Sequence, residues 1–331
     1  MRDEILKLLN GEKVSSIPAF SGLIHVTTAG LASEGLKLSE VHHDAAKMAR
    51  AAAGAFKSTG MPSAALPLDI CFPAEALGAE LIYYSDDEMQ FPQVKKLLFQ
   101  SAREIGKLEI GDWKRGRIGL ICEAIELAKK DIGGQAVISG MIPGPYTLML
   151  YICKAQNLFL EMKKDPQMAL DALFRLSAFL ANIGNAYRDA GADFITIHDM
   201  GGSPGFIGPA KYEQFVFPAE KYLIEKLPKP RVLSVCGNAD KSIQLLGQTG
   251  ADAISVDQTT DLKAAREALQ GTMLFGNIDP VETLCRGDEG SVAESVQRAK
   301  EAGVDAVWPG CDLVLQTPLE NLRVFAGRDD D

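Results

Sequence analysis

Long apolar runs and an excess of positive charge are both missing from this sequence. No stretch reaches about 18 apolar residues, the length that a membrane-spanning helix needs. Asp3 and Glu4 stand where a secretory signal has its basic start and apolar centre. The chain has 34 Lys and Arg against 44 Asp and Glu, and it has no basic stripe to neutralise phosphates. We therefore expect no membrane insertion, no nucleic-acid binding and a cytoplasmic location.

A disulfide framework is missing as well. The six cysteines lack the close, regular spacing of small secreted domains, so we expect reduced thiols. They are Cys71, Cys122, Cys153, Cys236, Cys285 and Cys311. With 331 residues and 47% hydrophobic content the chain can bury a large core, and no Pro- or Gly-rich linker divides it. One domain over residues 1–331 is the prediction.

What the sequence does contain is a series of eight short apolar runs, each followed by residues able to do chemistry. The runs cover residues 17–20, 64–68, 136–138, 194–197, 232–235, 253–256, 273–275 and 306–308. Alternating strands and helices build a parallel barrel whose active site gathers at the carboxyl ends of its strands. The pattern therefore predicts an α/β fold, a (β/α)8 TIM barrel with N-terminal insertions.

Helical periodicity and helix-ending glycines separate the later runs. Residues 262–269 and 291–302 each place apolar side chains on one face. Gly191, Gly250 and Gly303 each precede a strand by two or three residues, as tight helix-to-strand turns require. The first third is less regular, and we expect a hairpin formed by residues 81–84 and 89–91, then a charged helix near 117–130.

Two cysteines, distant in sequence, follow barrel strands. Cys236 comes after the fifth run and Cys311 after the eighth. In a closed barrel both can point over the central axis, where two thiolates could bind Zn²⁺ with His198, Asp199 or Asp257. The alternative interpretation is a pair of buried, unreactive thiols.

His198 and Asp199 end the fourth run. Neighbouring strand residues point to opposite sides, so at most one of the pair needs to face the axis. Either could donate a proton, bind a metal or bind substrate, and the alternative is a hydrogen-bonded histidine beside a loop-capping aspartate. His25, His42 and His43 are weaker candidates.

Other polar residues near strand ends are predicted to bind substrate. Asp69 and Glu75 flank the segment after the second run, where carboxylates can orient a substrate or tune a proton donor. Tyr146 lies in a helix-opening segment and could face a ligand. Asn238 and Asn277 each follow a glycine at a strand end.

Several segments together resemble the uroporphyrinogen decarboxylase superfamily, and most of all its corrinoid-dependent methyltransferase branch. The similarity runs almost end to end. It includes residues 10–14 with Ile17-Pro18, then 73–78, 144–148, 235–238, Gly276-Asn277, 309–311 and 317–321. Such collinearity is more specific than any single motif.

The resemblance implies a barrel that docks on a separate corrinoid protein and exchanges a methyl group with its cobalt. The decarboxylases carry an arginine-rich N-terminal segment that binds substrate carboxylates, but residues 19–25 here contain no arginine. Members that methylate thiols hold zinc with a His-x-Cys pair and a distant Cys. Here Cys236 and Cys311 match that pattern, whereas Ser234 stands where the histidine belongs.

The missing histidine favours transfer from a small methyl donor, such as a methoxyarene or a methylamine, to the corrinoid protein. In this hypothesis Asp199, His198 and Asp257 serve catalysis, because the departing oxygen or nitrogen needs an acid or a Lewis acid. The first alternative is zinc-dependent methylation of a thiol such as coenzyme M, and decarboxylation is a less favoured one. A non-enzymatic corrinoid-binding barrel is the alternative from a different class.

Overall fold

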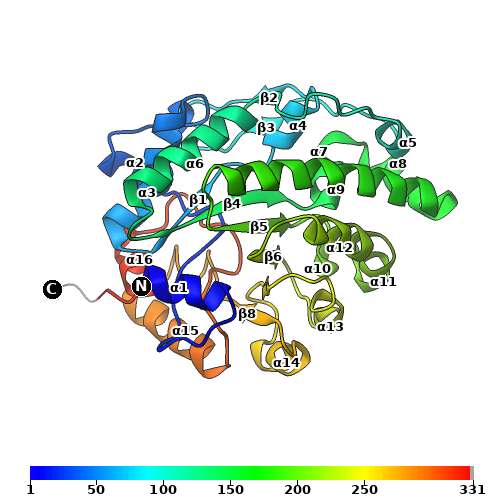
Figure 1. The fold of residues 1–331 in the computed structure, drawn as a ribbon. Helices are drawn as coiled ribbons and strands as arrows, with labels where there is room; N and C mark the ends of the chain where they lie inside the picture. The colour runs from blue at the N-terminus through cyan, green and yellow to red at the C-terminus, as the bar shows by residue number, and fades with distance from the viewer. Residues whose placement is uncertain (329–331) are drawn as a thin grey trace.

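Parallel strands at the centre of the molecule are surrounded by helices, as the computed structural model of the chain shows for residues 1–328 (Figure 1). Six strands form one sheet in the order β1-β4-β5-β6-β7-β8, and each neighbouring pair is parallel. Their bounds are β1 Ser63–Leu66, β4 Val137–Pro143, β5 Phe194–Asp199, β6 Arg231–Val235, β7 Ala253–Ser255 and β8 Met273–Phe275. These are six of the eight predicted runs.

The first and last predicted runs complete the ring through isolated parallel bridges. The bridges pair Phe275 with Ala306, and Val307 with Ala19. Beyond them, the Ser21 backbone N–H donates to Ser63 Oγ at 3.0 Å, which joins the first run to β1. All eight runs therefore take part in the barrel, and the predicted fold is confirmed.

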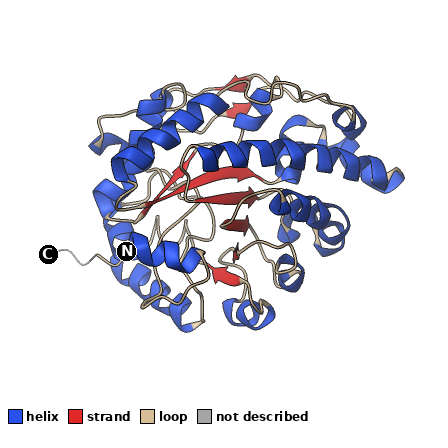
Figure 2. Ribbon diagram, viewed as in Figure 1, coloured by secondary structure: helices blue, strands red, loops and turns tan. Residues whose placement is uncertain are grey.

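Helices cover the outside of the barrel (Figure 2). The helices of seven or more residues include α3 Ala45–Thr59, α6 Ile118–Ile132, α7 Pro145–Ile152, α8 Ala155–Lys164, α9 Pro166–Asp189, α12 Phe217–Glu225, α14 Leu262–Ala268, α15 Glu289–Glu301 and α16 Leu319–Phe325. The shorter ones are α2 Thr28–Ser33, α4 Phe72–Ala76, α5 Ala102–Gly106, α10 Pro204–Ile207, α11 Pro209–Lys211 and α13 Ile243–Leu246. Across the described part of the chain, no helix is both long and apolar enough to span a bilayer.

The predicted helices are present, and side-chain caps explain where two of them begin. Asp261 accepts hydrogen bonds from the N–H groups of residues 263 and 264 at the start of α14, and Asp288 accepts from Ser291 N–H at the start of α15. The charged helix expected near 117–130 is α6.

The predicted hairpin forms with a different second strand. β2 (Leu81–Ile82) pairs antiparallel with β3 (Gln93–Val94), so the strand expected at 89–91 was wrong. Glu88 accepts hydrogen bonds from both the N–H and the hydroxyl of Ser85, which closes a turn, and Met89 then takes a positive φ of 47°. Pairing resumes only after this reversal, and residues 89–91 are left as a loop.

The barrel interior is a separate apolar cluster beneath the strand ends. It contains Phe20, Val137, Phe194, Val232, Ala253, Phe275, Ala306 and Trp308. Helix α1 (Arg2–Leu9) adds three buried side chains to the same cluster, where they meet the first residues of the strands. α1 therefore closes the amino end of the barrel, and the carboxyl end is left as its mouth.

Gly22 shows how tightly this interior is packed. A Cβ on Gly22 would lie 2.3 Å from Thr196 Oγ1 and 2.6 Å from the Trp308 ring. Real side chains do not approach so closely, so only glycine lets the chain pass here.

Candidate active site

Strand alternation decides which side chains reach the barrel axis. In β5, Phe194 belongs to the interior cluster, whereas Ile195 and Ile197 pack against the surrounding helices. His198 shares the phase of Phe194 and therefore faces inward, while Asp199 faces the helices. His198 is also the Cα partner of Ser234 in the β5–β6 pairing. An imidazole thus stands at the same level as Ser234, one strand away.

His198, Cys236 and Cys311 form a compact cluster at the mouth. One ligand atom from each residue lies within 4.8 Å of the other two. The Cys236 and Cys311 sulfurs are 2.8 Å apart, and Cys311 Sγ lies 3.9 Å from His198 Nε2. A disulfide has an S–S distance of about 2.05 Å, so these are free thiols. The predicted convergence of the two cysteines is therefore present in the structure.

The surroundings of the cluster favour the charged forms of His198 and Cys311 and disfavour that of Cys236. Burial would lower the pKa of His198, but the Asp312 carboxylate 3.4 Å from Nε2 and the Cys311 sulfur raise it to about 10. The thiol of Cys236 lowers the pKa of Cys311 by hydrogen bonding, and the pKa of Cys236 is raised in return. Cys311 is therefore the sulfur that ionises first.

The donor set of the cluster matches zinc. Zn²⁺ prefers imidazole nitrogen and thiolate sulfur, and catalytic zinc sites use three protein ligands with a fourth position open. His198, Cys236 and Cys311 supply one nitrogen and two sulfurs from three different strand ends. The nitrogen that Ser234 cannot supply is available from the neighbouring strand.

Asp199 lies away from this cluster, on the opposite face of β5. Its Oδ1 accepts hydrogen bonds from the N–H and hydroxyl of Thr147 and from Gly202 N–H. Its neighbour Glu220 accepts from the Tyr212 hydroxyl, and burial raises the pKa of both carboxyls. These contacts hold the start of α7 against β5, and they do not support the predicted catalytic role.

Tyr146 is also directed away from the mouth. It is fully buried, and its hydroxyl lies 3.7 Å from Met162 Sδ. The predicted start of a helix at this segment is confirmed by α7. The Tyr146 side chain packs beneath α8, because the residue faces the outer helices rather than the barrel axis. Its contacts do not support the predicted ligand-binding role.

Asp257, Asn238 and Asn277 lie at the ends of neighbouring strands. Asp257 is close enough to Cys236 to disfavour its thiolate, and its Oδ1 accepts from the N–H and hydroxyl of Thr259. Asn277 Nδ2 donates to the carbonyls of Asp257 and Thr260, and Asn238 Nδ2 donates to Asp240 and to the Thr259 carbonyl. These amide groups brace the loops of the rim.

Asp69 and Glu75 meet at a buried arginine that the sequence analysis missed. Arg117 Nη1 donates to Asp69 Oδ2 at 2.8 Å, and its Nε donates to Glu75 Oε2 at 2.9 Å. Burial would raise the pKa of Asp69, but Arg117 outweighs it and holds that pKa well below its usual range. The partners of Arg117 lie more than 40 positions earlier in the chain, so no local pattern predicts the ion pairs. The only signal in the sequence is the group of charged residues just before α6.

The remaining histidines have other contacts. His25 places its two ring nitrogens 2.7 Å and 3.0 Å from the carbonyls of Leu23 and Ser63. His43 packs against the ring of Tyr83, with ring centroids 4.1 Å apart. His42 lies beside Asp69, at 3.5 Å. None of these imidazoles belongs to the thiol cluster.

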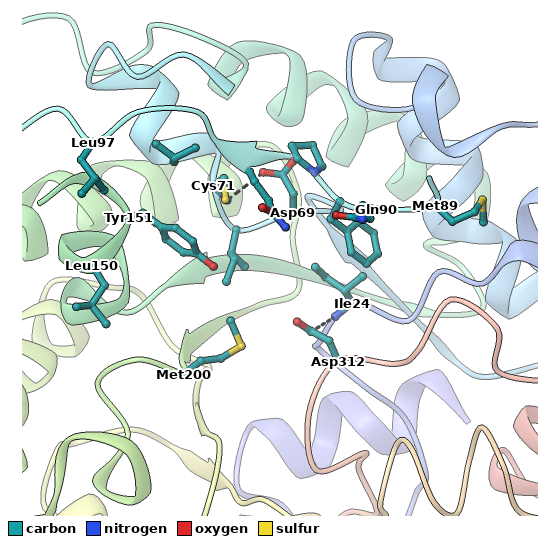
Figure 3. A pocket seen from close by; sticks show the side chains of 15 residues that line it. Ile24, Asp69, Cys71, Met89, Gln90, Leu97, Leu150, Tyr151, Met200 and Asp312 are labelled. Atoms are coloured by element: carbon teal, nitrogen blue, oxygen red, sulfur yellow. Dashed lines mark hydrogen bonds between the residues drawn. The ribbon is translucent and has the colours of Figure 1, made fainter. Parts of the chain in front are cut away.

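A cavity of about 540 Å³ reaches Asp312, the residue that follows Cys311 (Figure 3). Asp312 connects the cavity to the cluster, because it lines the cavity and also lies 3.4 Å from His198 Nε2. Across the cavity stands Asp69, and the hydroxyl of Tyr151 points toward the open centre. The loop left unpaired by the hairpin supplies further lining, including Gln90 and Phe91.

Comparisons with known proteins agree with this geometry. A model of the uroporphyrinogen decarboxylase (URO-D) family matches residues 1–328. A methylcobamide:CoM methyltransferase from Methanosarcina acetivorans is 30% identical over 97% of this chain and 95% of that protein. A methylated-thiol–coenzyme M methyltransferase from Methanosarcina mazei is 27% identical over 95% of this chain and 85% of that protein.

Solved structures share the fold. A methyltransferase from Methanosarcina mazei superposes with a TM-score of 0.93 at 24% identity, covering 98% of this chain and 97% of that one. The family match spans all but the last three residues, and the resemblance deduced from the sequence is confirmed. The chain therefore belongs to the uroporphyrinogen decarboxylase family, and its similarity is to the methylcobamide methyltransferases within it.

Proposed function

We propose that this protein transfers a methyl group between the cobalt of a separate corrinoid protein and a small thiol bound at the His198–Cys236–Cys311 cluster. The observation that carries the proposal is the set of one nitrogen and two sulfurs at the mouth of the barrel. The cavity beside it has room for a small molecule. The relatives named above are methyltransferases that act with a methylcobamide or on methylated thiols, which supports the same class of reaction.

In this proposal His198, Cys236 and Cys311 hold zinc, and the small molecule occupies the remaining position. Zinc, when bound there, lowers the pKa of a thiol so that a thiolate is present at neutral pH. The protein fixes the three residues that would hold the metal at separate strand ends, with their ligand atoms within 4.8 Å of one another. Asp312 stands against the imidazole and faces the cavity.

The position of His198 changes the preferred direction of transfer. The sequence alone favours demethylation of a methoxyarene or a methylamine, because Ser234 leaves the zinc site without a nitrogen. His198 is the Cα partner of Ser234 and lies within ligand distance of both sulfurs, so that reason no longer holds. Methylation of a thiol, the alternative of the sequence analysis, is therefore the proposal that the geometry supports best.

The test combines metal content with turnover. We expect about one zinc per chain in the purified protein and methylation of a small thiol from methylcobalamin. Cys236→Ser should lose both, whereas Cys285→Ser, a cysteine outside the cluster, should keep both. Zinc retained in full by Cys236→Ser would contradict the proposed site.

Two other outcomes separate the alternatives. Formation of methylcobalamin from a methyl ether or a methylamine, with no thiol methylated, would return the assignment to demethylation. Tight cobalamin binding without turnover of any methyl donor or acceptor would favour a binding protein. Both are read from the cobalt absorption spectrum of the same reaction mixtures.

A further inference from the structure

A surface of apolar and basic side chains lies beside the mouth of the barrel, on α8, α10 and α11. We infer that this surface docks the corrinoid protein, and that the docking face of that partner is apolar at its centre and acidic around it. The inference rests on the proposed function, in which a protein-borne cobalt must reach the cluster. We call it the α8–α11 surface, and its residues are Phe159, Leu160, Lys163, Lys164, Phe206 and Lys211.

The centre of the α8–α11 surface is apolar and open to solvent. Phe206 is 68% exposed, Leu160 53% and Phe159 39%. Among the described residues, these three and Met1 are the most exposed large hydrophobic side chains. Single exposed apolar residues are common, whereas grouped ones that include aromatic rings are typical of interaction surfaces.

The side chains of the α8–α11 surface are brought together by contacts between helices. Lys211 Nζ lies 4.9 Å from the centre of the Phe159 ring, which joins α11 to α8. Phe206 belongs to α10, which leads through Gly208 directly into α11. Along α8, Lys163 follows Phe159 by four residues, so both lie on one face of the helix. The surface is therefore continuous, although its parts are distant in sequence.

The α8–α11 surface adjoins the loop that carries Cys236. A Cβ on Gly205, the residue before Phe206, would lie 2.8 Å from the backbone nitrogen of Asn238. Real side chains do not approach so closely, so the two loops are packed backbone to backbone. α10 also follows β5, the strand that ends with His198 and Asp199, and α8, α10 and α11 all lie at the end of the barrel away from α1 (Figure 1). A protein seated on Phe206 would therefore stand beside the strand ends that hold the cluster.

The charge of the α8–α11 surface is opposite to that of the whole chain, which has a net charge of −10. Lys163, Lys164 and Lys211 are exposed, and no ion pair among the described residues includes them. The one acid of α8, Glu161, accepts hydrogen bonds from Ser101 and Ala102, and the acid at its end, Asp165, pairs with Arg103. An acidic partner face would be attracted to these lysines.

A protein partner other than a second copy suits this surface best. None of its six residues lines the cavity that reaches Asp312, so it is not the site of the small thiol. In a two-fold dimer the same surface would face itself, and the lysines of one copy would meet those of the other. Like charges at an interface oppose association, so the charge pattern favours a partner of opposite sign.

Two methyl donors of different size test the inference. Free methylcobalamin has no protein to dock, whereas a purified Methanosarcina corrinoid protein with a methylated cobamide must bind before transfer. With a small thiol as acceptor, Phe206→Ala should raise the KM for the corrinoid protein by about tenfold or more, as the loss of a central aromatic side chain does at protein interfaces. The kcat/KM with free methylcobalamin should stay unchanged. An unchanged KM for the corrinoid protein, or an equal loss with both donors, overturns the inference.

Charge reversal provides a matched pair of variants. Lys164→Glu reverses a charge on the α8–α11 surface, and Lys13→Glu does so at an exposed position that follows α1, at the closed end. Lys164→Glu should lower kcat/KM for the corrinoid protein by about threefold or more, and added salt should reduce the difference from the wild type. Lys13→Glu should leave kcat/KM unchanged. Equal effects of the two variants contradict the charge argument.

Direct binding separates this inference from the proposed function. If no thiol is methylated from either donor, the thiol methyltransferase proposal fails, but interferometry with the immobilised full chain still measures binding of the corrinoid protein. Weaker binding to Phe206→Ala than to the wild type supports the inference, and equal binding or none to either chain refutes it. Light scattering covers the other occupant. A wild-type dimer that Phe206→Ala dissociates would assign the surface to a second copy and overturn the inference.

Discussion

Moving the zinc-binding nitrogen from one strand to its neighbour is the sharpest test of the site. His198 and Ser234 are Cα partners in adjacent strands, and both are fully buried in the barrel interior. The first perturbation, His198→Ser, removes the imidazole. The second adds Ser234→His, which places an imidazole at the same level on β6, in the volume that the first change vacates.

The magnitude follows from the number of ligands. Structural zinc held by four protein ligands is bound with about 10–16 kcal/mol, so each ligand contributes roughly 3 kcal/mol. A loss of that size lowers zinc affinity by about a hundredfold. His198→Ser should therefore bind zinc about a hundredfold more weakly than the wild type. The double variant should bind zinc at least about tenfold more tightly than His198→Ser.

The assay is competition for zinc with a chromophoric chelator, supported by the absorption spectrum of the cobalt(II)-substituted protein. His43→Ser serves as the control, because that imidazole packs against Tyr83 outside the cluster. Wild-type zinc affinity in His198→Ser would refute the assignment of this ligand. A double variant no better than His198→Ser would refute the equivalence of the two strand positions.

The packing and the buried ion pairs give three further expectations. Arg117→Met should lower the free energy of unfolding in urea by about 3–5 kcal/mol, because it leaves Asp69 buried without its cation. Arg103→Met, which removes an exposed ion pair with Asp165, should lower the free energy of unfolding by less than about 1 kcal/mol. The lowered pKa of Asp69 stabilises the fold above about pH 4, and this contribution is lost as the pH falls. The wild-type urea midpoint should therefore drop more steeply below pH 4 than that of Arg117→Met. Gly22→Ala should lower the free energy of unfolding by about 1–3 kcal/mol, whereas Gly134→Ala, where a Cβ meets open space, should leave it unchanged. Equal urea midpoints for the two variants would contradict the packing described.

Much of the barrel could be predicted because its signals are local. Each run ends at polar residues, and parallel strands bring all their carboxyl ends to one side. The convergence of Cys236 and Cys311 follows from that rule alone. The pairing of β2 with β3 could not be read in the same way, because it depends on the turn that Glu88 closes and on the backbone of Met89.

The side-chain directions at the site were only partly readable. Phe194, Thr196 and His198 share one face of β5. The alternation of the strand is therefore enough to predict that His198, rather than Asp199, faces the barrel axis. Asp312 was overlooked because its role depends on the return of the chain beside Ile24. Arg117 belongs to an insertion, and no local pattern ties it to Asp69.

The closure of the amino end of the barrel by α1 has a consequence for the way ligands enter. The buried side chains of α1 fill that end, so ligands can reach the site only from the carboxyl end. Under the proposed function, a corrinoid protein and a small thiol would both approach from this end. The thiol would then bind before the corrinoid protein, which would cover the mouth and exclude water from it.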